Sequence, residues 1–412
     1  MSQELKLFPD PRALLGGTLS EKKPFQRFLG HLERIDCFMA TRKPAKGLQQ
    51  QKWCGEQRRS CHQRALTPGA VLVFAMASLL SVFVLLHLAV LHRKSVDPLF
   101  YVFAVLASTC VVGLTNALEQ DRYISGFVDF YLQKGEPYLG TAYCIMMCYW
   151  EGIVQFILQL LMVRQMSSGR PYRSMGLFWA GSAIANQVVF IPGIVIGKYG
   201  TSLYPAFWLN ILFLLLPVWT AVDLLRRPRE LPVIPADKVE AVQMKGLLLR
   251  PIDLILTLAL LVAMAFTVLR GAVVLDCRHD ICFSYIYHYE PYLKDNVAFP
   301  KVMMLVFLFY GLPLMAACVY GLCTPGCTWM LDWTLLFAGA MTQAQWCHIG
   351  GSLHSRTPFT YRIPSDAWWP VMWMNLLYMA APLMLALRCI IRPDFFMSVV
   401  PKGQANHEKK TQ

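Results

Sequence analysis

A single acidic residue, Glu151, lies in the middle of the long apolar stretch 140–163. A charged side chain at the centre of a bilayer costs about 2.5–3.5 kcal/mol on insertion scales, so such a residue marks a candidate site. Gln155 and Gln159 follow at i+4 and i+8, which places the three side chains on one face of a helix. A carboxyl group in these surroundings can give or accept a proton, as acid–base chemistry requires. The alternative is a protonated Glu151 that only bonds a neighbouring helix.

Other polar residues within apolar stretches are candidate contacts for a bound lipid. Amide side chains there often serve as hydrogen bonds between helices, which is the alternative for each of them. Glu119 lies near a helix end, where a solvated charge is the alternative, and His348 with Gln345 three residues earlier could instead be a structural pair. The candidate lipid contacts are Glu119, Gln155, Asn186, Asn210, Gln345, His348 and Asn375.

Arg270 is near the end of an apolar stretch, from which its long side chain is expected to reach the headgroups. The sequence has no pattern typical of a metal, phosphate, flavin or nicotinamide site, so neither a metal nor a cofactor is predicted.

The composition defines the setting of these residues. Of 412 residues, 56% are hydrophobic and 15% are charged, whereas ordinary globular domains have roughly 25% charged residues. With a mean hydropathy of +0.43, the chain is predicted to be a multi-pass membrane protein. This excludes a soluble enzyme, a nucleic-acid-binding module and a disulfide-rich secreted domain. The net charge of +13 does not indicate nucleic acid, because basic residues concentrate in residues 1–67 and in short loops, where they set membrane orientation.

The apolar stretches have the length of membrane-spanning helices. About 20 residues are needed, because roughly 30 Å of hydrocarbon is crossed at 1.5 Å per residue. Backbone groups cannot stay unpaired in lipid, so each stretch is predicted to be helical. The predicted fold class is an all-α polytopic membrane protein with about nine to ten transmembrane helices. The nine windows are 70–92, 98–118, 140–163, 175–196, 205–225, 252–275, 302–322, 331–349 and 368–391.

Basic residues are unevenly divided between the two sets of loops. The richer set, which includes 226–229 and the carboxyl tail, is predicted to be cytosolic by the positive-inside rule. Cys277 and Cys282 then lie on the lumenal side, where they either form a small disulfide loop or remain free thiols. Nine helices and a cytosolic tail would make the basic residues 1–67 lumenal, so either a further membrane segment or a different helix count is left open.

The last four residues place Lys409 and Lys410 at positions −4 and −3 of the predicted cytosolic tail. This spacing resembles a di-lysine signal, which coat proteins read to return membrane proteins to the endoplasmic reticulum. A solvated polar tail is the alternative.

Two parts of the chain repeat each other. Glu-Pro-Tyr-Leu occurs at 136–139 and again at 290–293, and Pro205, Trp208, Asn210 and Pro217 recur with identical spacing from residue 370 to residue 382. The two copies start on the same side of the membrane, so they are parallel, unlike the inverted repeats of many transporters. The predicted organisation is a basic segment 1–67, a transmembrane helix 68–92, a first domain 97–228, a cytosolic linker 229–250, a second domain 251–391 and a cytosolic tail 392–412.

Eight longer stretches carry a resemblance to a known family. They are DPLFYVFAV (97–105), GEPYLGTAY (135–143), CYWEG (148–152), GKYG (197–200), LRGAVVLDC (269–277), YEPYL (289–293), FAGAMTQAQ (337–345) and RTPFTYRIP (356–364). Together they resemble the transmembrane 6 superfamily, in which each half is a domain similar to emopamil-binding protein, called EXPERA. Residues 1–67 do not resemble the start of that family, which supplies an extra helix.

The resemblance also bears on catalysis. Related sterol isomerases use a histidine and a glutamate four residues apart, a second glutamate on the next helix, and an asparagine. Glu151 matches the second glutamate and Asn210 the asparagine, while Glu119 can stand for the first glutamate. Thr115 occupies the place of the histidine, so a group for proton transfer is missing. The resemblance therefore implies a sterol- or lipid-binding pocket more than an isomerase.

The second half and the carboxyl end are more similar to the second member of the family, associated with triglyceride secretion and lipid droplet content. We therefore predict a membrane protein of the endoplasmic reticulum, with the ER–Golgi intermediate compartment as a further location, that regulates lipid metabolism through an intramembrane pocket lined by Glu151, Gln155 and Asn210. Its expected partners are membrane lipids or a sterol, together with lipid-metabolism proteins in the same membrane, and no nucleic acid. The alternatives are a sterol isomerase that uses Glu151 and a lipid transporter. Part of the first half is more similar to the first member, which makes the lysosomal membrane the alternative location.

Overall fold

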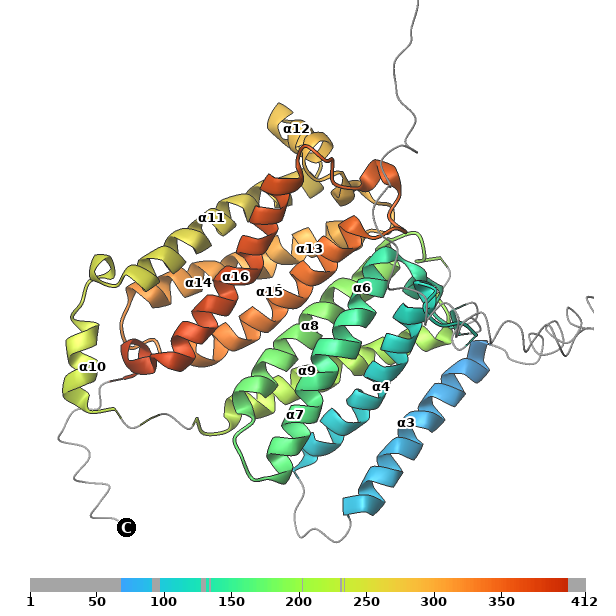
Figure 1. Ribbon diagram of the computed structural model, residues 1–412, viewed down its shortest axis with the longest axis horizontal. Coiled ribbons are helices and arrows are strands. Elements are labelled where there is room, and N and C mark those ends of the chain that lie inside the picture. Colours follow the sequence, from blue (N-terminus) through green and yellow to red (C-terminus); the bar gives the residue numbers. More distant parts are fainter. Residues whose placement is uncertain are drawn as a thin grey trace, which may run out of the picture. The chain divides into compact units, whose positions relative to one another are not determined.

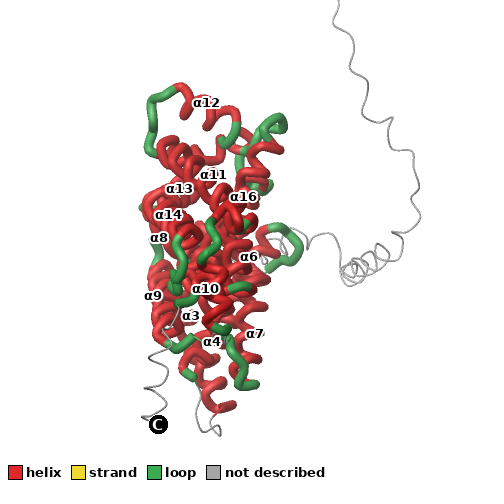
Figure 2. The backbone as a smooth tube through the Cα atoms, turned by 90° about the vertical axis from the view of Figure 1, so that its left-hand side faces the viewer, coloured by secondary structure: helices red, strands yellow, loops and turns green. Residues whose placement is uncertain are grey.

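The computed structural model describes residues 68–90, 97–126, 131–132, 135–201, 203–229, 232 and 234–398. Residues 1–67 and the predicted retrieval signal Lys409 and Lys410 lie outside the described residues. All regular structure in the described part is helical, as predicted (Figure 2).

Eight helices have the length and apolar composition of membrane spans, which confirms a polytopic membrane protein. They are Gly69–Leu88 within α3 (Pro68–Val90), α4 (Pro98–Gln120), Ala142–Ser167, α8 (Arg173–Ile196), Pro205–Arg226, α11 (Pro251–Val274), Phe299–Cys323 and α16 (Trp368–Ile391). Two of these spans contain a π-helical turn: Glu151–Gln155 separates α6 (Ala142–Trp150) from α7 (Phe156–Ser167), and Phe307–Gly311 separates α13 (Phe299–Val306) from α14 (Leu312–Cys323).

The ninth predicted window, 331–349, forms a helix but is not among those eight spans. It lies in α15 (Met330–Leu353), which has the same 24-residue length as α8. Gln343, Gln345 and His348 lower its hydropathy, and all three are buried among other helices. Because α15 packs against α8, α6 and α16, its polar groups face protein rather than lipid (Figure 1).

The sequence sets several of the helix boundaries. Asp97 caps α4, since its side chain accepts a hydrogen bond from the backbone of Leu99 (3.1 Å), and Pro98 occupies the first turn, where a missing N–H has no cost. Thr141 caps α6 in the same way by accepting from the backbone of Cys144. Glu136 lies in the loop just before this cap, a few residues ahead of the N-terminus of α6.

Several elements recur in the two halves in the same order. In each half the Glu-Pro-Tyr-Leu sequence forms a short 3₁₀ turn, at Pro137–Gly140 and Pro291–Lys294, before a span with a π-helical turn. The last helices of the two halves, α9 (Leu209–Arg226) and α16, each contain an internal proline, Pro217 or Pro382.

The halves meet where α8 crosses α15. A β-carbon on Gly181 would overlap the carbonyl oxygen of Leu336, and one on Gly339 would overlap that of Phe178. Backbones come this close only at small residues, which is how helices pack tightly within a membrane. At the end predicted to be cytosolic, Asp332 at the start of α15 accepts hydrogen bonds from two guanidinium groups, those of Arg173 and Arg229.

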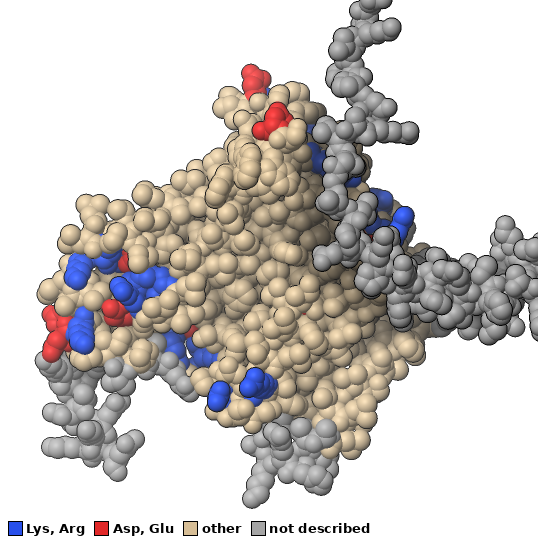
Figure 3. All heavy atoms as spheres, viewed as in Figure 1, with Lys and Arg blue, Asp and Glu red and all other residues tan. Residues whose placement is uncertain are grey.

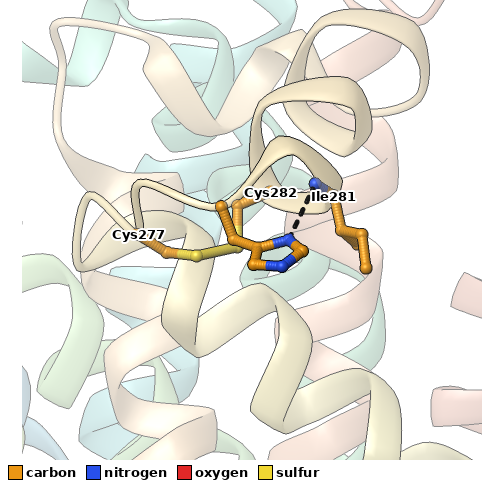
Figure 4. The surroundings of a disulfide bond; sticks show 4 residues. Cys277, Ile281 and Cys282 are labelled. Carbon is orange, nitrogen blue, oxygen red and sulfur yellow. Dashed lines mark hydrogen bonds between the residues drawn. A yellow bond between two sulfur atoms is a disulfide. The ribbon is translucent and has the colours of Figure 1, made fainter.

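Charged side chains gather at the two ends of the helices. On the face drawn in Figure 3, a broad band without Lys, Arg, Asp or Glu separates a basic end near α10 (Ala236–Gln243) from the opposite end near α12 (Asp280–His288). Near that opposite end, a disulfide joins Cys277 to Cys282 just before and within α12 (Figure 4). The ring of His279 accepts from the backbone of Ile281 and caps α12 between the two cysteines.

Candidate functional site

A cavity of about 270 Å³ lies in the first half. Its wall is formed by α3, α4, the α6–α7 span, α8 and α9, whose arrangement Figure 1 shows. This volume is near the lower end of small-molecule pockets, which are roughly 300–1,000 Å³. Most of the wall is apolar, including Leu106, Trp179, Phe190 and Phe213. A cavity with these walls suits an apolar ligand that carries few polar groups.

Polar side chains enter the same wall from several helices. The sequence-predicted residues Glu151, Gln155 and Asn210 are brought together here. The wall also contains Asn116, Glu136, Gln159 and Gln187, which the prediction did not assign to a lipid contact.

Two of the acceptors in this wall lack a partner. Asn116 donates weakly to the sulfur of Cys148 (3.5 Å), but among the described residues neither its Oδ1 nor Oε1 of Gln187 has a hydrogen-bond partner. A buried polar atom left unpaired costs about 1–3 kcal/mol. A ligand that donates a hydrogen bond to either atom would therefore offset part of that cost.

Glu151 is held by a chain of amides that crosses between the halves. Nδ2 of Asn186 donates to Oε1 of Glu151 (2.6 Å), and Nε2 of Gln343 donates to Oδ1 of Asn186 (2.9 Å). Because Oδ1 accepts from Gln343, Asn186 presents its donor and not its acceptor to the carboxylate. Gln343 on α15 thus fixes the orientation of a first-half side chain.

Gln155 is fixed by a second contact between helices. Its Nε2 donates to the hydroxyl of Ser182 on α8 (3.3 Å), which also accepts from Nε1 of Trp150 (2.8 Å). The glutamate and the glutamine therefore lie on the same π-helical turn, each tied to α8, with their positions set before any ligand enters.

Glu136 forms the other acidic group of the wall. It accepts from the hydroxyls of Tyr131 (2.5 Å) and Tyr138 (2.6 Å) and from Nδ2 of Asn210 (2.9 Å). Burial raises the pKa of this carboxyl, and these three uncharged donors lower it without reversing the shift. Asn210 therefore acts here as the support of Glu136, a pairing that the repeated Glu-Pro-Tyr-Leu sequence could have suggested.

The remaining predicted contacts do not belong to this cavity. Glu119 is buried and accepts from the backbone of Gly126 (2.9 Å) at the end of α4. Gln345, His348 and Asn375 lie buried in the second half. Asn186 is not part of the wall and reaches the site only through Glu151.

In the second half, Glu290 takes the place that Glu136 has in the first, but its partner is a cation. Nη2 of Arg270 lies 2.5 Å from Oε1 of Glu290 and 3.0 Å from Oδ1 of Asn375. The expectation that Arg270 reaches the headgroups is wrong: it is 1% exposed, because the loop after α11 folds back and buries Glu290 beside it. Burial acts to raise the pKa of Glu290, but Arg270, His348 and Tyr285 outweigh it and hold that pKa well below its usual range.

Comparison with known proteins shows which protein family the chain resembles. A family model described as "Transmembrane 6 superfamily member 2-like, transmembrane domain" matches residues 60–235. Over 317 residues the chain is 47% identical to transmembrane 6 superfamily member 2 of Mus musculus, which covers 77% of this chain and 84% of that relative. The chain belongs to this family. The member 2 protein of Homo sapiens is 48% identical over 316 residues, again covering 77% of this chain and 84% of the relative. No solved structure matches the chain.

The match to the member 2 family model includes every described residue of the cavity wall, since these residues lie between 74 and 217. The resemblance that led to the family was therefore correct.

Proposed function

We propose that the protein binds a lipid with a hydroxyl group, such as a sterol, in the first-half cavity, and that this binding serves the regulation of lipid metabolism. The observation that carries the proposal is the mainly apolar intramembrane cavity with buried acceptors at Asn116 and Gln187 and carboxyl groups at Glu136 and Glu151. A ligand that enters from the bilayer leaves lipid and not water, so the apolar wall contributes packing contacts, and the ligand hydroxyl would donate to the unpaired acceptors. The hydrogen bond from Asn186 holds the carboxyl group of Glu151 in position.

The proposal extends to location and partners. The endoplasmic-reticulum membrane is supported by the di-lysine spacing of Lys409 and Lys410. Membership of the member 2 family is compatible with a role in triglyceride secretion and lipid droplet content, shared with other lipid-metabolism proteins of that membrane.

A glycine in the cavity wall allows a direct test. A β-carbon on Gly113 would lie 3.6 Å from Oε2 of Glu151, an ordinary contact, so a larger side chain there enters the cavity without displacing the backbone. We expect Gly113→Leu to weaken saturable binding of tritiated cholesterol by about tenfold or more, equivalent to about 1.4 kcal/mol. The measurement uses the full chain in detergent micelles.

Gly311 supplies the matched control. It too lies in the middle of a span, in the π-helical turn of the second half, and a β-carbon there would be 3.7 Å from its nearest neighbour, Phe307. Gly311→Leu should bind cholesterol like the wild type. Equal binding by wild type and Gly113→Leu would exclude the first-half cavity as the binding site.

A second candidate is a sterol isomerase, favoured by one observation: the carboxyl group of Glu151 lines the cavity. Thr115 stands where related isomerases have a histidine, so we expect no deuterium from deuterated water in any sterol incubated with the wild-type protein. Incorporation by wild type that is lost in Glu151→Gln would instead establish an enzyme and identify its proton carrier.

A further inference from the structure

The first-half cavity has a counterpart position in the second half, which can be found residue by residue. Three pairs of residues keep the same spacing from a shared sequence landmark, and a fourth pair consists of the first residues of the two π-helical turns. Asn116 and Arg270 each precede the glutamate of the Glu-Pro-Tyr-Leu sequence by 20 residues. Three further pairs can be matched between the halves. In each pair the first-half residue lines the cavity, and its second-half counterpart is a buried aromatic or imidazole side chain.

The first difference between the halves is that Arg270 of the second half takes the position of Asn116 in the first. In the first half, Glu136 receives its donors from two tyrosines and Asn210, and Asn116 keeps a free acceptor at the cavity. In the second half, Arg270 donates to both Glu290 and Asn375, the counterpart of Asn210. Asn375 still donates to Glu290 (3.3 Å), as Asn210 does to Glu136, so the guanidinium group of Arg270 is an additional, charged partner of both side chains.

The second difference is at the π-helical turns. Glu151 is the first residue of one turn and Phe307 the first residue of the other. The ring of Phe307 is 4% exposed and stacks on Tyr378 with centroids 5.9 Å apart. Tyr378 follows Asn375 by three residues, as Phe213 follows Asn210, so a phenylalanine replaces the carboxyl group and packs onto the counterpart of a cavity wall residue.

These second-half side chains are in contact with one another. The guanidinium carbon of Arg270 lies 5.0 Å from the centre of the Tyr378 ring, on which Phe307 also stacks. His348 occupies the position of the wall residue Phe190, three residues after matching glutamines, and its Nε2 is 3.6 Å from Glu290. Arg270, Phe307, Tyr378 and His348 form one buried group, which we call the second-half plug.

We propose that the plug occupies the second half permanently, so that the protein takes up one lipid per chain, in the first half, and Arg270 with Phe307 prevents a second. This inference rests on the proposed function and specifies its stoichiometry. The halves would then have different roles: the first holds the ligand, and the second is a fixed support that reaches the site through Gln343.

The test maps the labelling of the full chain by a photoreactive cholesterol analogue in detergent micelles. After proteolysis and mass spectrometry, labelled peptides should come from 68–90 or 98–226, which contain the helices around the cavity, and competition with excess cholesterol should remove the label. Labelling of the second half near Tyr292 and His348, each of which keeps a buried polar atom without a partner, would overturn the inference. If no peptide is labelled in a competable way, the proposed function itself fails, and the inference fails with it.

Removing the plug provides the complementary experiment. Arg270→Asn combined with Phe307→Glu gives the second half the first-half residues at both positions. The unpaired hydroxyl of Tyr292 is then available to donate to Glu290, as Tyr138 does to Glu136. Competable labelling should appear in 251–391 and bound analogue should rise from one toward two per chain. A folded double variant that still labels only the first half would show that Arg270 and Phe307 are not what excludes lipid. If the double variant does not fold, the labelling pattern of the wild-type protein alone tests the inference.

Discussion

Arg270→Leu is expected to destabilise the protein by about 3–5 kcal/mol, the usual cost of removing one partner from a buried ion pair. The substitution leaves Glu290 buried at 1% exposure without its cation, and a leucine cannot donate to Asn375. The loss should be measured as a lower thermal unfolding temperature of the full chain in detergent. Arg270→Leu with Glu290→Gln should recover most of it, because neither residue of the former ion pair then carries a charge.

The pH dependence of this variant gives an independent check. In the wild type the pKa of Glu290 is held below its usual value, so its contribution to stability is present at neutral pH and is lost only as pH falls through that low pKa. Without Arg270, burial should raise that pKa, and protonation then relieves the destabilisation. The gap between Arg270→Leu and wild type should therefore narrow between pH 8 and pH 5.

A surface pair is the control for this series. Lys301 and Asp276 are 3.6 Å apart with both side chains substantially exposed, so Lys301→Met should change stability by less than about 1 kcal/mol. An Arg270→Leu protein as stable as Lys301→Met would contradict the account of a buried ion pair in the second half.

The second large effect is expected at the crossing of α8 and α15. Gly181→Ala places a β-carbon against the carbonyl oxygen of Leu336, which belongs to the helix backbone and cannot rotate away. The helices must move apart, and overpacking of this kind costs about 1–3 kcal/mol. Because Asn186 and Gln343 lie on these two helices, the 2.9 Å hydrogen bond between them should lengthen and cholesterol binding should weaken as well.

Gly246→Ala serves as the comparison, since a β-carbon there would meet no atom within 4 Å. Unfolding temperature and cholesterol binding should both fall in Gly181→Ala and stay unchanged in Gly246→Ala. Equal behaviour of the two variants would mean that the crossing of α8 and α15 does not hold the halves together.

Much of the fold could be predicted because lipid imposes simple rules on sequence. A charge-free stretch of sufficient length must be helical, so eight of the nine windows appear as spans. The window 331–349 shows where that rule weakens. Helix α15 is surrounded by other helices, so it tolerates Gln343, Gln345 and His348, and its hydropathy no longer reports its position.

The candidate site was partly predictable for the same reason. Glu151 stands out because a charge within an apolar stretch is costly, and Gln155 follows from helical spacing. The roles of Glu136 and Arg270 could not be found in this way. Arg270 binds Glu290, which lies in a loop 20 residues later, and Glu136 lies in a loop and binds Asn210 on a later helix. Spacing along one helix carries no information about such contacts.

The most direct test of the lipid-binding cavity is to count the lipid that stays with the protein when it is purified from membranes under mild detergent. We expect close to one sterol or other hydroxyl-bearing lipid per chain, measured by mass spectrometry of the extracted lipid. Gly311→Leu should retain this lipid and Gly113→Leu should lose it. A wild-type protein that carries no stoichiometric lipid, or a Gly113→Leu protein that carries as much as the wild type, would contradict the account.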